Sequence, residues 1–404
     1  MLSPKTIATI KSTVPVLEIH GTDITKRFYN MLFTNHPELL NIFNHANQKQ
    51  GKQQQALANA VYAAAKNIDQ LEAILPVVKQ VAHKHRSLGV QPEHYPIVGE
   101  YLLKAIKDVL KDDATEEILQ AWEEAYGVIA DVFIEVEEEM YQDAAKQPGG
   151  WEQERIFVVD RKEQESDVIT SFYLKPLDGK PIASFKSGQY ISVKVSIPDD
   201  QYTHIRQYSL SDVPGKPYYR ISVKKEANTA KPDGIVSNYL HDHVGVNDQL
   251  TVTAPAGDFY LEKSTAPIVL LSGGVGITPM LSMLKSSALQ HRKTTFIHAA
   301  LNGNVHAFHR EVLSLEHPSL DYFVCYEAPT ENDADKKSYN KEGFITSDWL
   351  KEILSLDAET QYYFCGPLAF MKAIKVALTN LGVEEKNMHF EFFGPAVALE
   401  PAMS

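Results

Sequence analysis

The stretch LLSGGVGITPM, residues 270–280, decides the fold of the last third of the chain. It follows the apolar run PIVLL, which is typical of a buried strand, and it leads into MLSMLKSSAL, which has the spacing of a helix. Glycines at positions 273, 274 and 276 allow backbone N–H groups to face a phosphate with no Cβ in the way. An ordinary turn needs only one glycine, so this cluster favours a phosphate-binding loop.

The alternation of strands and helices continues around this loop, from about Ser264 to the C-terminus. Buried strands are predicted at TTFIHAA, DYFVCYEA, QYYFC and MHFEFF, and a further helix at LAFMKAIKVAL. Such alternation predicts a parallel sheet with helices on both faces, whose ligands bind beyond the carboxyl ends of the strands. We therefore expect an α/β domain at residues 264–404.

Residues 151–262 have a different pattern, in which short β-rich runs are separated by turn residues. The runs VITSFYLKP, QYISVKVSIP, RQYSLS, YYRISVKKE and QLTVTAP predict an antiparallel barrel or sandwich, and GIVSNYLHDH predicts a short helix. The Pro/Gly break at residues 147–150 ends the preceding helix, and we place a domain boundary there.

Residues 1–147 are expected to form an all-α domain. Ser3 and Pro4 are a helix start, and apolar residues then recur at helical spacing at Ile7, Ile10, Val14 and Leu17. After Ala114 a long apolar stripe predicts one helix with a single buried face, formed by Ile118, Trp122, Ala125, Ile129, Phe133, Val136 and Met140.

Composition excludes several classes of protein. With 404 residues, 44% hydrophobic and 23% charged, the chain is neither disordered nor fibrous. Its formal net charge of -13 argues against a nucleic-acid partner, and its two cysteines exclude a disulfide framework and a cysteine-based metal cluster. No apolar run approaches the roughly 20 residues of a membrane helix. We expect a cytoplasmic monomer with no integral membrane contact.

The glycine loop departs from the usual G-x-G-x-x-G pattern, because Pro279 occupies the place of the last glycine. Together with a later Cys-Gly-Pro after a strand, the loop resembles the pyridine-nucleotide lobe of the ferredoxin reductase-like family. The resemblance implies an NAD(P)H site formed by Ser272, Gly273, Gly274, Val275, Gly276, Ile277, Thr278, Pro279, Cys365, Gly366 and Pro367.

The run Arg206-Gln207-Tyr208-Ser209 offers a guanidinium for a diphosphate, an aromatic face for a flat ring and a hydroxyl donor. Alone, such residues on a strand are about as often exposed surface residues without a ligand as they are part of a binding site. With Gly188-Gln189-Tyr190 upstream and Gly234-Ile235-Val236-Ser237 downstream, the set resembles the flavin barrel of the same reductase family. Ser187 stands where that family usually has proline.

The C-terminal HFEFFGP, residues 389–395, places a carboxylate among aromatic residues at the end of the last strand. Phe390 and Phe392 could simply be core residues. By the resemblance, the segment after them covers the flavin and Glu391 lies near the electron-transfer centre. The FAD site implied in this way comprises Tyr190, Arg206, Gln207, Tyr208, Ser209, Gly234, Val236, Ser237, Glu391, Phe392, Phe393, Gly394 and Pro395.

An all-α domain joined to a flavin reductase needs an electron acceptor, and a haem held by histidine is the next candidate when cysteine clusters are absent. His83 and His85 point about 200° apart around a helix, so only one can face a buried pocket, and either could be a solvated surface residue. The surrounding residues favour His85.

Glu137 lies on the apolar stripe of the last helix of this domain, where a carboxylate requires a partner. Tyr95 could supply a hydroxyl, so that Glu137, Tyr95 and His85 would form a chain that makes the imidazole more basic. A more basic imidazole favours O2 activation over storage. The alternative is that the Glu137 side chain extends to a helix end.

On the other side of the expected pocket, Tyr29 lies on an apolar stripe, and Gln53 and Leu57 share one helix face. Tyrosine and glutamine can donate hydrogen bonds to bound O2 without ligating iron. The alternative is one core tyrosine and one surface glutamine. Phe43 is either core packing or a haem contact.

Taken together, these residues resemble the flavohaemoglobin family over residues 1–396, with a globin, an FAD barrel and an NAD(P)H lobe in that order. The resemblance implies that His85 is the proximal ligand of haem b, and that Tyr95 and Glu137 form its charge relay. It also places Tyr29, Gln53 and Leu57 on the distal side, and Lys84 and Glu391 where family members tune the redox centres.

The implied activity is nitric oxide dioxygenation, in which electrons pass from NAD(P)H through FAD to haem, and O2 and nitric oxide become nitrate. A flavin is required because NAD(P)H delivers two electrons and haem iron accepts one. The nitric oxide substrate comes from the resemblance alone. Two alternatives are a haem-based oxygen or redox sensor, which needs no hydride supply, and a general flavin reductase of ferric iron, quinones or peroxides.

Overall fold

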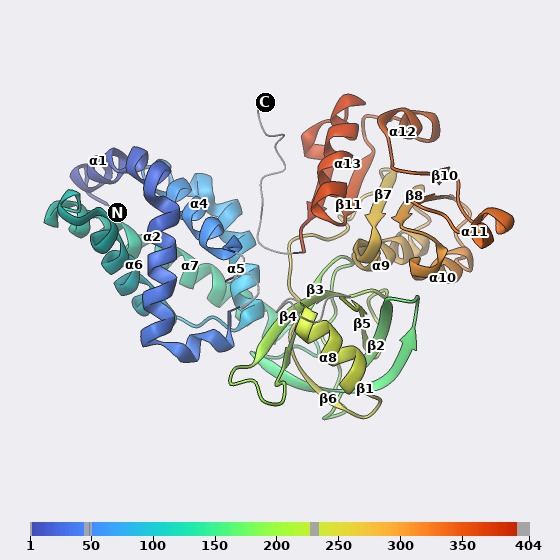
Figure 1. Cartoon of the computed structure of the whole chain (residues 1–404), viewed down its shortest axis with the longest axis horizontal. Coiled ribbons are helices and arrows are strands. Elements are labelled where there is room, and N and C mark those ends of the chain that lie inside the picture. Colours follow the sequence, from blue (N-terminus) through green and yellow to red (C-terminus); the bar gives the residue numbers. More distant parts are fainter. Residues whose placement is uncertain (1, 44–47, 49–50, 227–233, 394–404) are drawn as a thin grey trace.

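The protein is described here as a computed structural model, which covers residues 2–43, 48, 51–226 and 234–393. Figure 1 shows three bodies along the chain: helices at one side, then a sheet that contains β1–β6, then a second sheet that contains β7–β12. Gly394 and Pro395 of the expected FAD site lie outside the described residues. The domain boundaries expected at residues 147–151 and 262–264 stay predictions.

The first body contains only helices in its described residues. They are α1 (Pro4–Ser12), α2 (Val14–Asn35), η1 (Pro37–Asn41), α4 (Lys52–Lys66), η2 (Leu71–Ile74), α5 (Leu75–Leu88), α6 (His94–Leu110), η3 (Lys111–Asp113) and α7 (Glu116–Lys146). The Ser3 hydroxyl caps α1 by accepting from the backbone N–H of Thr6. The stripe that begins at Ile7 is interrupted after Ser12, because Pro15 has no N–H to donate within a continuous helix.

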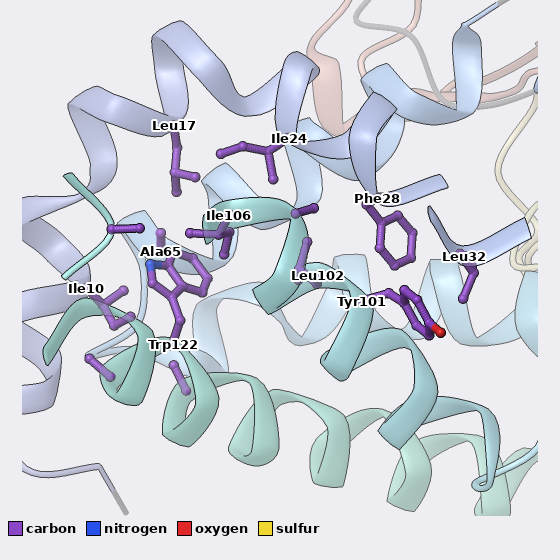
Figure 2. Packing of buried hydrophobic residues seen from close by; sticks show 14 of the residues in the cluster. Ile10, Leu17, Ile24, Phe28, Leu32, Ala65, Tyr101, Leu102, Ile106 and Trp122 are labelled. Carbon is purple, nitrogen blue, oxygen red and sulfur yellow. The ribbon is translucent and has the colours of Figure 1, made fainter. Parts of the chain in front are cut away.

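The core of the helical body lies between α2, α6 and α7. Figure 2 shows Leu17, Ile24 and Phe28 pointing from α2 toward α6, with Trp122 of α7 beside them. These side chains occupy one face of each helix, as the apolar periodicity predicts. This packing fixes α2 and α6 against each other and leaves α5 to pack on α7.

The second body is an antiparallel sheet with strand order β4-β3-β6-β1-β2-β5. A bridge between Leu210 and Ile221 brings its two edge strands together, which closes the sheet toward a barrel. The expected short helix is also present. The elements are β1 (Glu154–Gln164), β2 (Ile169–Pro176), β3 (Tyr190–Val195), β4 (His204–Ser209), β5 (Tyr219–Lys224), α8 (Ile235–His243) and β6 (Gln249–Thr253).

The third body is a parallel sheet with strand order β10-β9-β8-β7-β11-β12. Helix α9 packs on one face and α13 on the other, as expected for an α/β fold. Its strands are β7 (Ile268–Gly273), β8 (Thr294–Ala300), β9 (Leu320–Tyr326), β10 (Lys341–Glu342), β11 (Gln361–Cys365) and β12 (Met388–Glu391). Its helices are η5 (Gly274–Gly276), α9 (Ile277–Leu289), η6 (Gly303–Val305), α10 (His309–Leu313), α11 (Glu331–Lys336), α12 (Ser347–Ile353), α13 (Leu368–Asn380) and η7 (Glu385–Asn387).

The order of the central strands positions the glycine loop. Strands β7 and β11 are neighbours, with Ser272 paired to Cys365, so the loops that follow both strands meet at one edge of the sheet. The sequence predicted the three fold types, whereas β10, which is only two residues long, was not predicted. Every described helix is too short or too polar to cross a lipid bilayer.

Candidate functional site

The side chains of His85, Tyr95 and Glu137, each from a different helix of the first body, meet at one place. The His85 Nδ1 atom lies 2.7 Å from Oε1 of Glu137 and 3.2 Å from the hydroxyl of Tyr95. The Tyr95 hydroxyl donates to the same carboxylate oxygen at 2.7 Å. The Glu137 residue is only 3% exposed, so the alternative in which its side chain extends to a helix end is wrong. The predicted contact of these three groups is confirmed.

This contact decides which nitrogen of His85 is free. A carboxylate beside Nδ1 favours the tautomer that carries its proton there, so the lone pair of Nε2 is left for a metal ion. Burial and the Glu137 carboxylate both raise the pKa of Tyr95, which therefore keeps its proton and remains a donor. Tyr126 in turn donates to the backbone carbonyl of Tyr95 at 2.7 Å and holds the start of α6 in place.

His83 is oriented differently from His85, as the helix geometry requires. The charges that act on its imidazole come from Asp258 and Lys186 of the barrel and from the neighbouring Arg86. Burial lowers the pKa of His83, and Asp258 acts in the opposite direction. His83 therefore lies toward the barrel, and His85 toward Glu137.

The expected distal residues belong to one cluster between α2 and α4. The Tyr29 ring lies 5.6 Å from Phe33 and 5.9 Å from Phe43, measured between ring centroids. Burial raises the pKa of Tyr29, with Gln53 acting in the opposite direction, so the phenol stays protonated. Leu57 packs against the same hydrophobic cluster.

Gln53 is not a surface glutamine. It is half-buried, and its Oε1 atom is buried without a hydrogen-bond partner among the residues that the structure describes. A buried polar atom of this kind requires a partner. The polar groups of Tyr29 and Gln53 lie together at the edge of a hydrophobic cluster, with Gln48 also acting on Tyr29, so this place offers hydrogen-bonding groups for a small polar ligand.

Lys84 joins the His85 helix to the strand that was expected to bind FAD. Its ammonium donates to Oε1 of Gln207 at 2.5 Å and lies 5.8 Å from the centroid of the Tyr190 ring. Burial lowers the pKa of Lys84 to about 8, and Glu391 acts in the opposite direction. Burial likewise raises the pKa of Glu391 to about 8, opposed by Lys84.

The FAD residues predicted from the sequence are brought together around β3 and β4. Tyr190 pairs with Ser209 across these strands, and burial raises the pKa of Tyr208 as well as that of Tyr190. Oε2 of Glu391 is buried and has no partner among the described atoms, and this carboxyl group interacts electrostatically with Tyr190.

The remaining residues of the predicted FAD set differ in what they offer. The side chain of Val236 is 1% exposed within the barrel core, so only its backbone can meet a ligand. The Ser237 hydroxyl donates to the carbonyl of Gly234 at 3.1 Å. Phe392 packs against the core beside α13, as expected if it is simply a core residue. Phe393 is exposed.

The glycine loop forms a tight cradle against the loop that follows β11. A Cβ at Gly276 would lie 2.1 Å from the carbonyl oxygen of Cys365, and Gly274 has a positive φ of 52°. Only glycine suits either place. The Cys365–Pro367 segment and the start of α9 at Ile277 therefore lie together, with the N–H groups of a helix N-terminus available to a phosphate.

Ser272 was expected to contact the nucleotide, but its side chain is engaged elsewhere. It is fully buried, and its hydroxyl lies 2.8 Å from Nδ1 of His298. The hydroxyl of Thr278 likewise donates to the carbonyl of Val275 at 3.0 Å, which stabilises the turn. In this loop the Ser272 and Thr278 side chains are used within the protein, so a ligand would meet mainly backbone N–H groups.

Arg86 is a residue that the sequence interpretation missed. It is 6% exposed, and its guanidinium donates to the backbone carbonyl of Pro255 in the barrel. The signal was present, because Arg86 follows the buried Ala82 by four residues and so shares its helix face. The residues at 84, 85 and 86 thus point to Gln207 of β4, to Glu137 of α7 and to the barrel backbone at Pro255.

Comparisons with known proteins agree with this organisation. A globin family model matches residues 26–133, an oxidoreductase FAD-binding domain matches residues 157–260, and an oxidoreductase NAD-binding domain matches residues 270–376. The flavohemoprotein of Bacillus cereus is 60% identical, over 99% of this chain and 100% of that protein. The chain belongs to the flavohemoprotein family. The Bacillus subtilis family member is 55% identical over 99% of both chains.

Solved structures of the family lead to the same conclusion. The flavohemoglobin of Malassezia yamatoensis, which has bound FAD and heme, matches with a TM-score of 0.84 and 27% identity, over 97% of this chain and all of that one. The FAD/NAD binding domain of nitric oxide dioxygenase from Vibrio cholerae is 37% identical and covers 60% of this chain, with a TM-score of 0.55. The predicted fold and the predicted cofactors, haem, FAD and a nicotinamide nucleotide, are confirmed at the level of the family.

Proposed function

We propose that this flavohemoprotein is an NAD(P)H-dependent nitric oxide dioxygenase, which converts nitric oxide and O2 to nitrate and so removes nitric oxide. The observation that carries the proposal is the buried Glu137 carboxylate held 2.7 Å from the His85 imidazole and 2.7 Å from the Tyr95 hydroxyl. A sensor or a simple oxygen store has no need of this arrangement together with a reductase. The name of the related Vibrio cholerae protein supports the same activity.

When bound, the nucleotide would supply two electrons, FAD would convert them to single electrons, and haem would supply O2 chemistry. Each conversion of nitric oxide and O2 to nitrate needs one electron, so one NAD(P)H supports two conversions. The chain must therefore hold a flavin between the nucleotide and the haem.

His85 is the residue that would hold the haem iron through Nε2. Glu137 keeps the proton of the imidazole at Nδ1 and increases the electron density of the ring. Tyr95 donates to the same carboxylate oxygen, so the carboxylate cannot rotate away from the imidazole. A strongly donating imidazole favours cleavage and transfer chemistry of O2 over its release.

Tyr29 and Gln53 would act on the opposite side of the haem. Both carry donor groups beside a hydrophobic cluster, where a hydrogen bond to a ligand that gains negative charge would be stronger than in water. The raised pKa of Tyr29 keeps its hydroxyl protonated at neutral pH, so it donates rather than repels. Phe43 and Leu57, which pack against the same cluster, would exclude water from this side.

Between the two redox centres, Lys84 contacts Gln207 and interacts electrostatically with Glu391. Two groups with pKa values near 8, one basic and one acidic, would respond to a change of net charge nearby as electrons pass. Arg206, Tyr208 and Ser209 would hold FAD, and the glycine cradle would hold the diphosphate of the nucleotide. The expectations of a cytoplasmic monomer belong to the same proposal.

The test uses the full chain loaded with haem and FAD. A nitric oxide electrode is expected to show rapid nitric oxide consumption that requires both NADH and O2. Consumption that proceeds without NADH, or none with all substrates present, would contradict the proposal. NADH oxidation with ferric iron or quinones but without nitric oxide consumption would instead favour the general flavin reductase.

A further inference from the structure

Four charged side chains meet where the barrel contacts the parallel-sheet body. Arg220 comes from β5 and Asp212 from the segment after β4, whereas Lys285 lies on α9 and Glu311 on α10. Arg220 is 3% exposed and Asp212 is also buried. Two cations and two carboxylates thus form an ion-paired cluster across one junction, with Glu165 acting electrostatically on it. The haem and nucleotide residues described above do not include these four residues.

Each cation of the cluster pairs with a carboxylate across the junction. Nη1 of Arg220 lies 3.0 Å from Oε2 of Glu311, and Nζ of Lys285 lies 2.6 Å from Oδ1 of Asp212. Lys285 also pairs with Glu311. The guanidinium of Arg220 is further fixed within its own body, where Nε donates to the hydroxyl of Ser211 at 3.1 Å.

The buried members of the cluster keep their charges. Burial lowers the pKa of Arg220, whereas Glu311 and Asp212 raise it. The two carboxylates together have the larger effect, so the net shift is upward. Burial raises the pKa of Asp212, whereas Arg220 and Lys285 lower it. The two cations together have the larger effect, so the net shift is downward. A buried charge that loses its partner is strongly destabilising, so the cluster resists separation of the two bodies.

The cluster lies close to both groups of ligand-binding residues. Asp212 follows the predicted FAD strand by three residues after Ser209. Lys285 lies on α9, the helix that begins directly after the glycine cradle. Two neutral contacts support the same junction: Ser282 donates to the carbonyl of Asp212 at 2.7 Å, and the hydroxyls of Ser187 and Ser286 lie 2.6 Å apart.

We propose that Asp212, Arg220, Lys285 and Glu311 are positioning residues that align the nicotinamide ring with the flavin for hydride transfer. The inference rests on the proposed function. In the step concerned, the C–H bond of the dihydronicotinamide breaks and its hydride, with both electrons, forms a bond to the flavin. NADH is oxidised to NAD⁺, and FAD is reduced to the FADH⁻ anion, so atoms and charges balance.

The reason for a charge cluster at this junction is geometric. Hydride transfer requires donor and acceptor atoms about 3–3.5 Å apart with aligned orbitals, and a misplacement of about 1 Å can reduce the rate 100-fold. The nucleotide is bound by the parallel-sheet body and the flavin by the barrel. The position of the nucleotide relative to the flavin therefore depends on the contacts that hold α9 and α10 against the barrel.

The experiment compares two variants of the haem- and FAD-loaded full chain with the unmodified protein. K285M removes one cation and retains the pair between Arg220 and Glu311, whereas E311Q removes the carboxylate that both cations share. E385Q is the control, because it breaks an exposed pair of 3.1 Å with Lys375 inside the parallel-sheet body. Each protein is mixed anaerobically with saturating NADH, and bleaching of the flavin is followed.

We expect the flavin reduction rate at saturating NADH to fall at least about tenfold in K285M and further in E311Q. The dissociation constant of NAD⁺ should change less than about twofold, because the nucleotide binds to one body alone. A second readout without turnover is hydrogen exchange in the oxidised protein, which should increase in α9 and in residues 210–224. E385Q should match the unmodified protein in all three.

The outcomes separate the inference from the proposed function. Variants that reduce flavin as fast as the unmodified protein overturn the inference alone. If a variant loses FAD or NAD⁺ binding in proportion to its rate, the cluster has a merely structural role and the inference is also overturned. If NADH does not reduce the flavin of the unmodified protein, the proposed electron route itself fails.

Discussion

The barrel meets its two neighbours through junctions of different chemistry. Toward the parallel-sheet body, Arg220 and Lys285 pair with buried or half-buried carboxylates. Toward the helical body, the polar contacts that we describe end on neutral oxygens. Lys84 donates to the Gln207 amide and Arg86 to the carbonyl of Pro255, and Thr203 contacts the Asn41 amide oxygen at 2.9 Å.

Under the proposed function, this difference matches what each junction would transfer. A hydride moves only between atoms that are nearly in contact, so the first junction must be rigid. A single electron does not need atomic contact between donor and acceptor, so proximity is enough at the second junction. We therefore expect each junction to be disabled separately, with a different kinetic signature.

The largest effect should come from removing the proposed iron ligand. We expect H85A to lose its Soret band and more than about 99% of nitric oxide consumption, because the substitution removes the proposed ligand of the haem iron. NADH should still bleach the flavin at the normal rate, since the charged junction is intact. Absorption spectra and stopped-flow mixing measure both quantities.

The matched control for H85A is H83A, on the same helix but oriented toward the barrel. It should retain the Soret band. If H85A binds haem normally and H83A does not, the assignment of the proximal ligand is wrong.

The next effect concerns the partner of the imidazole. E137Q should reduce nitric oxide consumption by about 10- to 100-fold, because the Nδ1 proton of His85 loses its anionic acceptor. Flavin reduction should again be unchanged. The iron–histidine stretching band in resonance Raman spectra should shift to lower frequency, which a general loss of stability would not produce.

E138Q is the control for this substitution, because Glu138 is the adjacent residue on α7 and is exposed. It should leave activity and the Raman band unchanged. Equal activity in E137Q and E138Q would show that the buried carboxylate does not act on the haem.

Breaking the neutral junction should have a smaller effect. R86M removes the hydrogen bond to the Pro255 carbonyl, and we expect transfer from reduced flavin to haem to slow by about 3- to 10-fold. The rate of flavin reduction by NADH should not change. Stopped-flow traces at flavin and Soret wavelengths separate the two steps, and R161M, at an exposed pair within the barrel, is the control. Slower reduction of the flavin by NADH in R86M would contradict the expectation that the two junctions act on different steps.

The smallest effect concerns a set of neutral histidines near the charged junction. Burial lowers the pKa of His298 to about 3, whereas an unfolded histidine has a pKa of about 6.5. Between these values the unfolded state binds more protons, so stability rises with pH. Lowering the pH from 6.5 to 5 should therefore reduce the free energy of unfolding by up to about 2 kcal/mol through His298.

Thermal unfolding between pH 5 and 7 measures this contribution. H298N should show a shallower pH dependence than the unmodified protein, whereas H291N, at an exposed histidine, should not. Identical slopes in H298N and the unmodified protein would show that His298 is not held neutral by the fold.

The sequence predicted those features that depend on local pattern. Alternation and helical spacing identified the three fold types, and a carboxylate on an apolar stripe identified Glu137 as a group that needs a partner. The same rule, applied to Arg86, would have predicted its burial. It was missed because Arg86 lies beside His85 and Lys84, whose chemistry explained the segment.

The charge cluster could not be predicted in this way. Asp212 and Lys285 are 73 residues apart and Arg220 and Glu311 are 91 residues apart, on elements that meet only when two bodies dock. The partner of the Ser272 hydroxyl, His298, was likewise not predicted, so a nucleotide contact of Ser272 would have to use its backbone. The sequence pattern indicates which residues are buried, but it does not indicate which residue each buried polar group contacts.

The most direct test of the central claim, that electrons from a nucleotide reach the haem and produce nitrate, is the ratio of nitrate formed to NADH consumed. The measurement uses the fully loaded protein with limiting NADH and excess nitric oxide and O2. We predict roughly two nitrate ions for each NADH, because each conversion takes one electron. NADH oxidised with little or no nitrate formed would contradict the account.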